Sequence, residues 1–231
     1  MKRWTWLLVA IGLCVVACGD DDVVVTTVKT TAETRPAIRI LALGDSYTIG
    51  ESVDEAERWP NQLGGILRTN GYASVDVEIV ARTGWTTAEL DEGIDRADPQ
   101  GPYDLVTLLI GVNNQFRGFD AEEYRIEFAG LLERAVDFSL GPVLVVSIPD
   151  WGVTPFGAGY DPPRIAAEID LFNAIGREEA TRIGVSFVDI APISRSGELG
   201  LVAADGLHPS RLQYSLWAEE MLPVVLGLLR S

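Results

Sequence analysis

The sequence contains few of the side chains on which metal and nucleotide sites depend. Its 231 residues include one histidine and two cysteines, too few for the sets of His and Cys ligands that hold zinc. It also lacks the glycine-rich loops G-x-G-x-x-G and G-x-x-x-x-G-K-[ST], whose backbone binds the phosphates of nucleotides. We therefore expect neither a metal ion nor a cofactor.

Basic residues are scarce as well. Lys and Arg total 18 against 34 Asp and Glu, which gives a formal net charge of −16. A surface with this charge is repelled by phosphate backbones, so we expect no nucleic-acid partner. Hydrophobic residues make up 47% of the chain. This share and the length suit one domain with a substantial core.

The N-terminus has the pattern of a secretory leader. Lys2 and Arg3 precede an apolar run over residues 4–17, which is too short to span a bilayer. The run ends in Val15-Val16-Ala17-Cys18-Gly19, which resembles the lipobox of bacterial lipoproteins. Cys14 is a weaker candidate because the bulky Leu13 precedes it. A plain secretory leader with an incidental cysteine is the alternative.

The lipobox resemblance implies three segments. Residues 1–17 would be a lipoprotein signal peptide, Cys18 the lipidated first residue, and residues 18–36 a flexible tether. The remaining domain would span residues 37–231. We then expect a lipid anchor in the membrane of a bacterial cell envelope, and the outer membrane is favoured because Gly19, not an aspartate, follows the cysteine.

From residue 37 onward, short apolar runs alternate with amphipathic stretches. This alternation predicts an α/β fold: a five-stranded parallel, flavodoxin-like sheet in a three-layer α/β/α arrangement. A final helix is expected to start at Pro209, with a kink or an end at Pro223. The expected strands are 38–43, 75–80, 105–110, 143–148 and 185–190, and the other expected helices are 55–69, 86–97, 121–138 and 163–183.

Residues suited to a functional site follow each expected strand. The carboxyl ends of parallel strands meet at one edge of a sheet, where ligands bind in open α/β folds. In strand order, these residues are Ser46, Gly84, Asn113, Asp150 with Trp151, and Asp205 with His208. The pattern therefore predicts a single site at this edge.

The residue types at this edge suit nucleophilic catalysis. A serine hydroxyl needs a base to take its proton, and His208 is the only histidine in the chain. Asp205, three residues earlier, can orient the imidazole and stabilise its charged form. Ser46 is not part of a G-x-S-x-G motif, which argues against the α/β-hydrolase arrangement. We therefore interpret the chain as a serine esterase.

Four short blocks resemble, in order, those of the SGNH/GDSL hydrolase superfamily. They are Gly44-Asp45-Ser46-Tyr47, Gly84, Gly111-Val112-Asn113-Asn114 and Asp205-Gly206-Leu207-His208. The resemblance extends from Ala37 to the end of the chain. It implies an α/β/α fold and a cofactor-free hydrolase that acts on esters or thioesters.

The resemblance also implies a role for each matching residue. Ser46 would be the nucleophile, His208 the general base, and Asp205 the group that orients His208. The backbone N–H groups of Ser46 and Gly84 and the side-chain amide of Asn113 would form the oxyanion hole. Asn114 departs from the family, which usually has aspartate there. We expect activity to persist, with altered electrostatics in that loop.

The flanking residues allow two interpretations. Tyr47, Trp85 and Trp151 are candidate walls of a substrate pocket, or they cover the sheet edge. For Arg82 and Arg117, salt bridges in so acidic a protein are favoured over recognition of an anionic substrate.

Several functional hypotheses stay open. The substrate would be a small-molecule or polymer ester, such as a lipid acyl ester, a thioester or an acetylated sugar. The alternatives are an inactive surface lipoprotein that binds a carbohydrate or a partner, and an acyltransferase that uses an alcohol in place of water.

Overall fold

The computed structural model describes residues 35–230. The expected leader, Cys18 and the expected tether up to residue 34 lie outside the described residues. Within residues 35–230, no helix has both the length and the apolarity needed to cross a bilayer.

A single parallel sheet forms the centre of the domain. Its strands are β1 (Ile38–Gly44), β2 (Val75–Ala81), β3 (Leu105–Leu109), β4 (Val143–Val146) and β5 (Ser186–Val188), in the order β2-β1-β3-β4-β5. Every residue of β3 and β4 is buried, as strands covered on both faces should be. The predicted five-stranded, flavodoxin-like sheet is confirmed.

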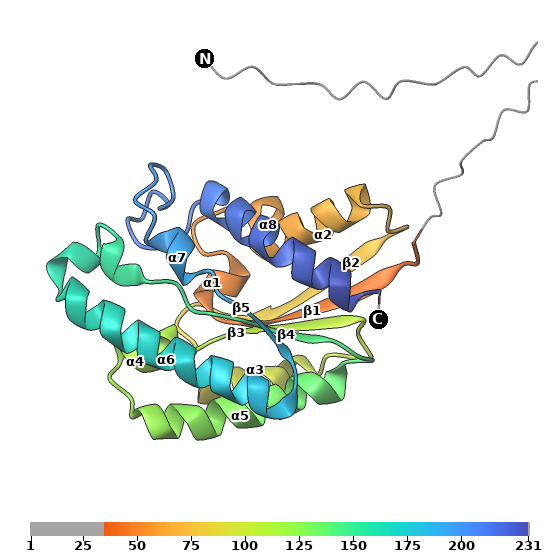
Figure 1. The fold of residues 1–231 in the computed structure, drawn as a ribbon, viewed down its shortest axis with the longest axis horizontal. Coiled ribbons are helices and arrows are strands. Elements are labelled where there is room, and N and C mark those ends of the chain that lie inside the picture. The colour runs from red at the N-terminus through yellow and green to blue at the C-terminus, as the bar shows by residue number, and fades with distance from the viewer. Residues whose placement is uncertain (1–34, 231) are drawn as a thin grey trace, which may run out of the picture. The chain divides into compact units, whose positions relative to one another are not determined.

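Helices cover both faces of the sheet, as Figure 1 shows. The long helices α2 (Trp59–Thr69) and α8 (Arg211–Leu228) pack together on one face. The opposite face carries α3 (Thr87–Ala97), α5 (Ala121–Phe138) and α6 (Pro162–Ile183). Trp59 and Trp217 are fully buried on the first face, and Phe128 and Ile169 are buried on the second. The three-layer arrangement is the one predicted.

Most of these helices begin at a side chain that caps them. Thr86 and Glu89 form a capping box at the start of α3, and Asp120, Asp161 and Ser210 accept backbone N–H bonds at the starts of α5, α6 and α8. Such caps satisfy backbone donors that have no partner within the helix.

The prediction that the last helix starts at Pro209 is wrong, and the helix does not end at Pro223. Ser210 is the N-cap of α8, so Pro209 lies outside the helix. The helix also continues through Pro223 to Leu228. Pro223 faces solvent, while Met221 and Val225 stay buried on the inner face. Packing of that inner face compensates for the backbone hydrogen bond that proline removes.

Other boundaries differ from the predicted ones by smaller amounts. The expected helix 55–69 is a short 3₁₀ turn, η1 (Glu55–Glu57), followed after Arg58 by α2. The strand expected at 185–190 is only three residues long, because the chain turns into the short helix α7 (Ala191–Ser194).

The strand order reverses between β1 and β3, and the polar residues gather there. Two short helices follow these strands directly: α1 (Ser46–Ile49) after β1 and α4 (Val112–Phe116) after β3. Such a reversal point opens a crevice at the carboxyl ends of the strands. Gly44 is required at this point, since a Cβ there would collide with the Thr48 side chain and the Leu109 carbonyl.

Candidate active site

A cavity of about 210 Å³ lies at this edge of the sheet. It brings together residues from the ends of β1, β2 and β3 and from the loop before α8. Its lining includes four of the predicted site residues, Ser46, Gly84, Asn113 and His208, and two of the three predicted aromatic residues, Tyr47 and Trp151.

Ser46 is the first residue of α1 and is held in a buried turn. The Asp45 carboxylate caps the helix by accepting a 3.0 Å hydrogen bond from the Tyr47 N–H. Within residues 35–230, neither the hydroxyl nor the backbone N–H of Ser46 makes a hydrogen bond. Both groups are therefore available to a ligand in the cavity.

Asp45 itself is completely buried beside Ser46. Burial raises the pKa of its carboxyl to about 7, against the opposing effect of the backbone N–H groups of Tyr47 and Asp45. Its Oδ2 atom has no hydrogen-bond partner within the described residues. The protonated form is thus stabilised by the fold.

His208 and Asp205 form a close pair. The distance from His208 Nδ1 to Asp205 Oδ2 is 2.6 Å. A carboxylate partner requires the proton on Nδ1, so Nε2 is left with its lone pair free to accept a proton. The imidazole side chain is 12% exposed and the carboxylate side chain 31% exposed.

Asp205 is fixed by further donors. Its Oδ1 accepts the backbone N–H groups of Leu207 and His208, and its Oδ2 accepts the Ser52 hydroxyl at 2.6 Å. Burial alone would raise the pKa of Asp205, but the bonds from Ser52, Leu207 and His208 outweigh it and hold the pKa well below its usual value. Asp205 is therefore an anion at neutral pH.

Ser52 was not predicted from the sequence. It lies 153 residues from Asp205 along the chain, in a loop with no motif of its own. Its positive φ of 68° is unusual for a residue other than glycine. Only the folded chain brings this hydroxyl to the carboxylate.

The loop after β2 is clamped by residues of α4 and its C-cap. Gly84 has a φ of +88°, which glycine adopts without strain. Arg117 Nη2 donates to the Gly84 carbonyl at 2.6 Å, and Arg117 Nη1 pairs with Glu89 at 3.2 Å. The salt bridge predicted for Arg117 is present. Within the described residues, the Gly84 N–H itself donates to no protein acceptor.

Asn113 is oriented by the same loop. Its Nδ2 donates to the Trp85 carbonyl at 2.8 Å. A carbonyl only accepts, so this bond fixes which end of the amide is the NH₂ group. One N–H of that group remains for a ligand in the cavity.

Asn114, where the family usually has aspartate, is fully buried. Its Oδ1 accepts the Thr87 N–H at 3.1 Å, and its Nδ2 donates to the Thr87 hydroxyl at 2.6 Å. That hydroxyl in turn donates to Glu127. An aspartate here would compete with Glu127 for the single Thr87 proton, so the neutral amide matches its surroundings.

Two expectations about flanking side chains need correction. The Trp85 ring packs against Gly93 of α3 and lies under the Arg96 guanidinium, and it does not line the cavity. Gly93 leaves the room that the indole occupies. Arg82 is exposed and forms no ion pair within residues 35–230, so the salt bridge expected for it is absent there.

Four aromatic residues form a cluster beside the cavity, and the sequence predicted only one of them, Trp151. Trp151, Phe116, Phe156 and Tyr160 contact one another, with ring centroids between 5.1 and 6.4 Å apart. Phe156 and Tyr160 come from the segment between β4 and α6, whose apolar residues carry no regular period. The cavity lining that the sequence did not predict consists of Thr83, Val112, Phe116, Phe156 and Leu207.

The described residues offer no obvious metal site. Residues 35–230 contain no group of three or more His, Cys, Asp or Glu side chains placed to bind one ion.

Comparisons with known proteins agree with this architecture. The sequence profile of the GDSL-like lipase/acylhydrolase family matches residues 42–216. No curated protein matches the sequence significantly.

Several solved structures share the fold. TesA is 20% identical, with a TM-score of 0.67 over 82% of this chain and 99% of its own. A member of the lipolytic G-D-S-L family from Veillonella parvula is 18% identical, with the same TM-score and coverage. The acetyl xylan esterase AlAXEase is 17% identical, with a TM-score of 0.65 over 81% of this chain and all of its own. At these identities the likeness concerns the fold alone.

Proposed function

The chain belongs to the GDSL-like lipase/acylhydrolase family and is a hydrolase of ester bonds, and we propose that it works as a serine esterase through an acyl-enzyme on Ser46. The observation that carries the proposal is the shared cavity of Ser46, Gly84, Asn113 and His208. Its imidazole is held by Asp205 through Nδ1, which leaves Nε2 as the base.

The proposed reaction has two halves. In the first, His208 Nε2 takes the proton of the Ser46 hydroxyl while the oxygen attacks the ester carbonyl, and Asp205 stabilises the imidazolium. The tetrahedral intermediate then collapses as the imidazolium gives its proton to the leaving alcohol. In the second half, a water molecule deprotonated by His208 hydrolyses the acyl-enzyme and releases the acid.

Three donors would stabilise the negative charge on the carbonyl oxygen. They are the N–H groups of Ser46 and Gly84 and the second N–H of the Asn113 amide. The first two have no protein acceptor within residues 35–230, and the third is oriented by the Trp85 carbonyl. Donors fixed before the reaction cost no reorganisation when the charge develops, which supports this assignment.

The cavity favours a short acyl group. Its volume of about 210 Å³ is below the roughly 300–1,000 Å³ of sites that enclose drug-sized ligands. Tyr47, Phe116, Trp151 and Phe156 contribute aromatic rings to its lining. We infer that acetyl and other short-chain esters of small molecules or polymers are better substrates than long-chain lipids. Two structural neighbours described as acetyl xylan or acetyl-xylooligosaccharide esterases are compatible with this preference.

Hydrolysis of nitrophenyl acetate by the Ser46→Ala variant tests the proposal. We expect the rate to fall by at least about a thousandfold, because no nucleophile remains. Ser215→Ala is the matched control, since the hydroxyl of this half-buried serine bonds only to its own helix α8. Equal rates for Ser46→Ala and the unmodified protein would contradict the proposal. Product analysis with added glycerol separates hydrolysis from acyl transfer.

We also propose that Cys18 carries a lipid that anchors the protein in a bacterial cell envelope, the outer membrane being favoured. The run Val15-Val16-Ala17-Cys18-Gly19 supports this proposal. Expression in a bacterium with labelled palmitate tests it: the unmodified protein should take up label and fractionate with membranes. Cys18→Ala should do neither, and label uptake by that variant would contradict the proposal.

A further inference from the structure

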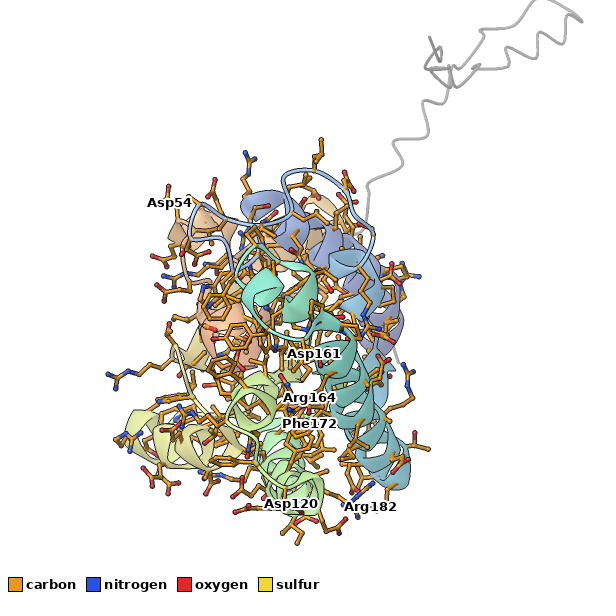
Figure 2. The ribbon with its side chains drawn as sticks, turned by 90° about the vertical axis from the view of Figure 1, so that its left-hand side faces the viewer. Asp54, Asp120, Asp161, Arg164, Phe172 and Arg182 are labelled. Carbon is orange, nitrogen blue, oxygen red and sulfur yellow. The ribbon has the colours of Figure 1, made fainter. Side chains whose placement is uncertain are left out.

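A second cavity adjoins the one that contains Ser46. Its volume is about 220 Å³, and it shares the rings of Phe116 and Trp151 with the first cavity. Its lining includes Asp161 and Arg164, which lie at the start of α6 and are labelled in Figure 2. The ester chemistry described above does not use this space.

A chain of hydrogen bonds fixes one side of the second cavity. Arg164 Nε donates to Glu168 at 2.6 Å, and the buried Gln115 donates to the other Glu168 oxygen at 2.7 Å. The Trp151 indole N–H donates to Gln115 at 2.7 Å. Gln115, which lines the second cavity, therefore fixes the Trp151 ring, and this ring forms a wall of both cavities.

Other groups at this cavity are open to a ligand. Within residues 35–230, the Tyr160 hydroxyl, the Arg164 Nη1 and Nη2 atoms and the Asp161 Oδ2 atom make no hydrogen bond. The residues Phe116 and Tyr160 are 47% and 52% exposed. A fitting ligand thus needs an apolar face for the rings and several groups that both donate and accept hydrogen bonds.

The charges of the cavity select among such ligands. Glu168 compensates Arg164, and Asp161 leaves an excess of one negative charge. The chain as a whole has a net charge of −16, so an anionic ligand is repelled. A quaternary ammonium group would meet the free edge of the Arg164 guanidinium. A neutral ring with several hydroxyl groups satisfies both the aromatic and the polar lining.

We propose that the second cavity is a sugar-binding subsite, which holds a neutral sugar ring of the substrate while the ester group reaches Ser46 in the first cavity. This inference rests on the proposed esterase function. It defines the substrate class as short-chain esters of carbohydrates, and it makes Tyr160 and Arg164 determinants of specificity.

The kinetic test compares two esters. The ratio of kcat/KM for acetylated xylobiose to that for nitrophenyl acetate, which has no sugar, isolates the contribution of the sugar. We expect Tyr160→Ala and Arg164→Ala each to lower this ratio about tenfold, since each removes one contact to the sugar. Arg182→Ala is the control: it removes an ion pair to Glu179 at the other end of the same helix (Figure 2) and should leave the ratio unchanged.

A binding test keeps the inference separate from catalysis. Calorimetry measures the affinity of xylotriose for the Ser46→Ala variant, alone and combined with Arg164→Ala or Tyr160→Ala. We expect binding to the single variant and at least fivefold weaker binding to both double variants. If the unmodified protein hydrolyses no ester, the esterase proposal fails while this titration still decides the subsite.

Three results would overturn the sugar-binding subsite. The first is a kcat/KM ratio for the sugar ester that neither variant changes. The second is the absence of xylotriose binding to the Ser46→Ala variant. The third is a preference for acetylcholine over acetylated xylobiose that Tyr160→Ala abolishes, which would assign the cavity to a quaternary ammonium group.

Discussion

The turn that carries Ser46 and the loop that carries Asp205 and His208 meet at one cavity, yet they are held in different ways. The turn is an extension of the sheet: Gly44 pairs with strands on both sides, and Asp45 and Ser46 are buried. Its geometry therefore depends on the core of the domain.

The Asp205–His208 loop lies at the surface and is held mainly by its own backbone. The Ala203 N–H donates to the His208 carbonyl at 2.8 Å, and the Ser210 N–H donates to the Leu201 carbonyl at 2.7 Å. The Asp205 carboxylate adds two local N–H bonds and the distant Ser52 hydroxyl. A change of the Asp205 side chain should thus cost activity before stability, and a change of the backbone packing at Gly44 in the turn should cost stability first.

The largest expected effect is a loss of activity without a loss of stability, caused by a substitution in the Asp205–His208 loop. Asp205→Asn keeps an oxygen for the backbone N–H groups of Leu207 and His208, but it loses the charge that stabilises the imidazolium. We expect kcat for nitrophenyl acetate to fall by roughly 10³–10⁴, with a melting temperature close to that of the unmodified protein. A melting temperature well below that of the unmodified protein would contradict the proposed difference between the loop and the turn.

The matching change in the turn is Gly44→Ala. The new methyl group collides with Thr48 and with the Leu109 carbonyl, and the Leu109 backbone belongs to a central strand that has little freedom to move. We expect a loss of about 3 kcal/mol in the free energy of unfolding, measured by urea titration. Gly130→Ala is the control, because a Cβ at that helical position meets no atom within 4 Å. Equal stability of the two variants would contradict the account.

A smaller effect should appear in the pH dependence of stability. The pKa of Asp45 is raised from 3.8 to about 7 in the folded protein. The stabilisation from its protonated form is complete below the unfolded pKa and is lost as the pH rises through the folded pKa. The Asp45→Asn variant should therefore gain stability relative to the unmodified protein between about pH 4 and pH 7, by on the order of 3 kcal/mol. A difference that does not change over this range would contradict the burial argument.

The smallest effect concerns the hydrogen bond from Ser52 to Asp205 of the loop. Ser52→Ala removes the hydroxyl that lowers the pKa of Asp205, yet Asp205 stays ionised at neutral pH. We expect kcat to fall only about threefold at pH 7. The loss of stability in this variant should be largest near neutral pH and should shrink in acid, because a carboxyl with a depressed pKa stabilises the fold only above its unfolded pKa, and that stabilisation is lost as the pH drops.

Ser52→Gly sharpens this test. Glycine adopts the positive φ of 68° at this position without strain, whereas alanine keeps the strain that the Cβ of serine causes. The two variants should share the same loss of activity, but Ser52→Gly should be the more stable. Full activity in both would show that the hydroxyl does not position Asp205.

The sequence predicted the parts of the site that depend on local pattern. Ser46 and Asn113 directly follow apolar strands, and a parallel sheet brings such positions to one edge. The spacing of Asp205 and His208 on one loop likewise predicted their 2.6 Å contact. These features require only the order of the strands and a few neighbouring residues.

The errors involve contacts between segments that are distant in the chain. Trp85 was a candidate for the cavity wall, but the absence of a side chain at Gly93 opens a place for its ring against α3. Phe156 and Tyr160 gain their roles only when their segment folds against Phe116. Ser52 reaches Asp205 across the fold. No local period or motif encodes these contacts.

The central claim is that Ser46 is activated by His208, and covalent labelling tests it most directly. An activated phosphonate ester should transfer one phosphonyl group to Ser46, located by mass spectrometry of the digested protein. We predict that His208→Ala slows this labelling by at least about a thousandfold. A phosphonyl group on another side chain, or equal labelling rates in both proteins, would contradict the claim.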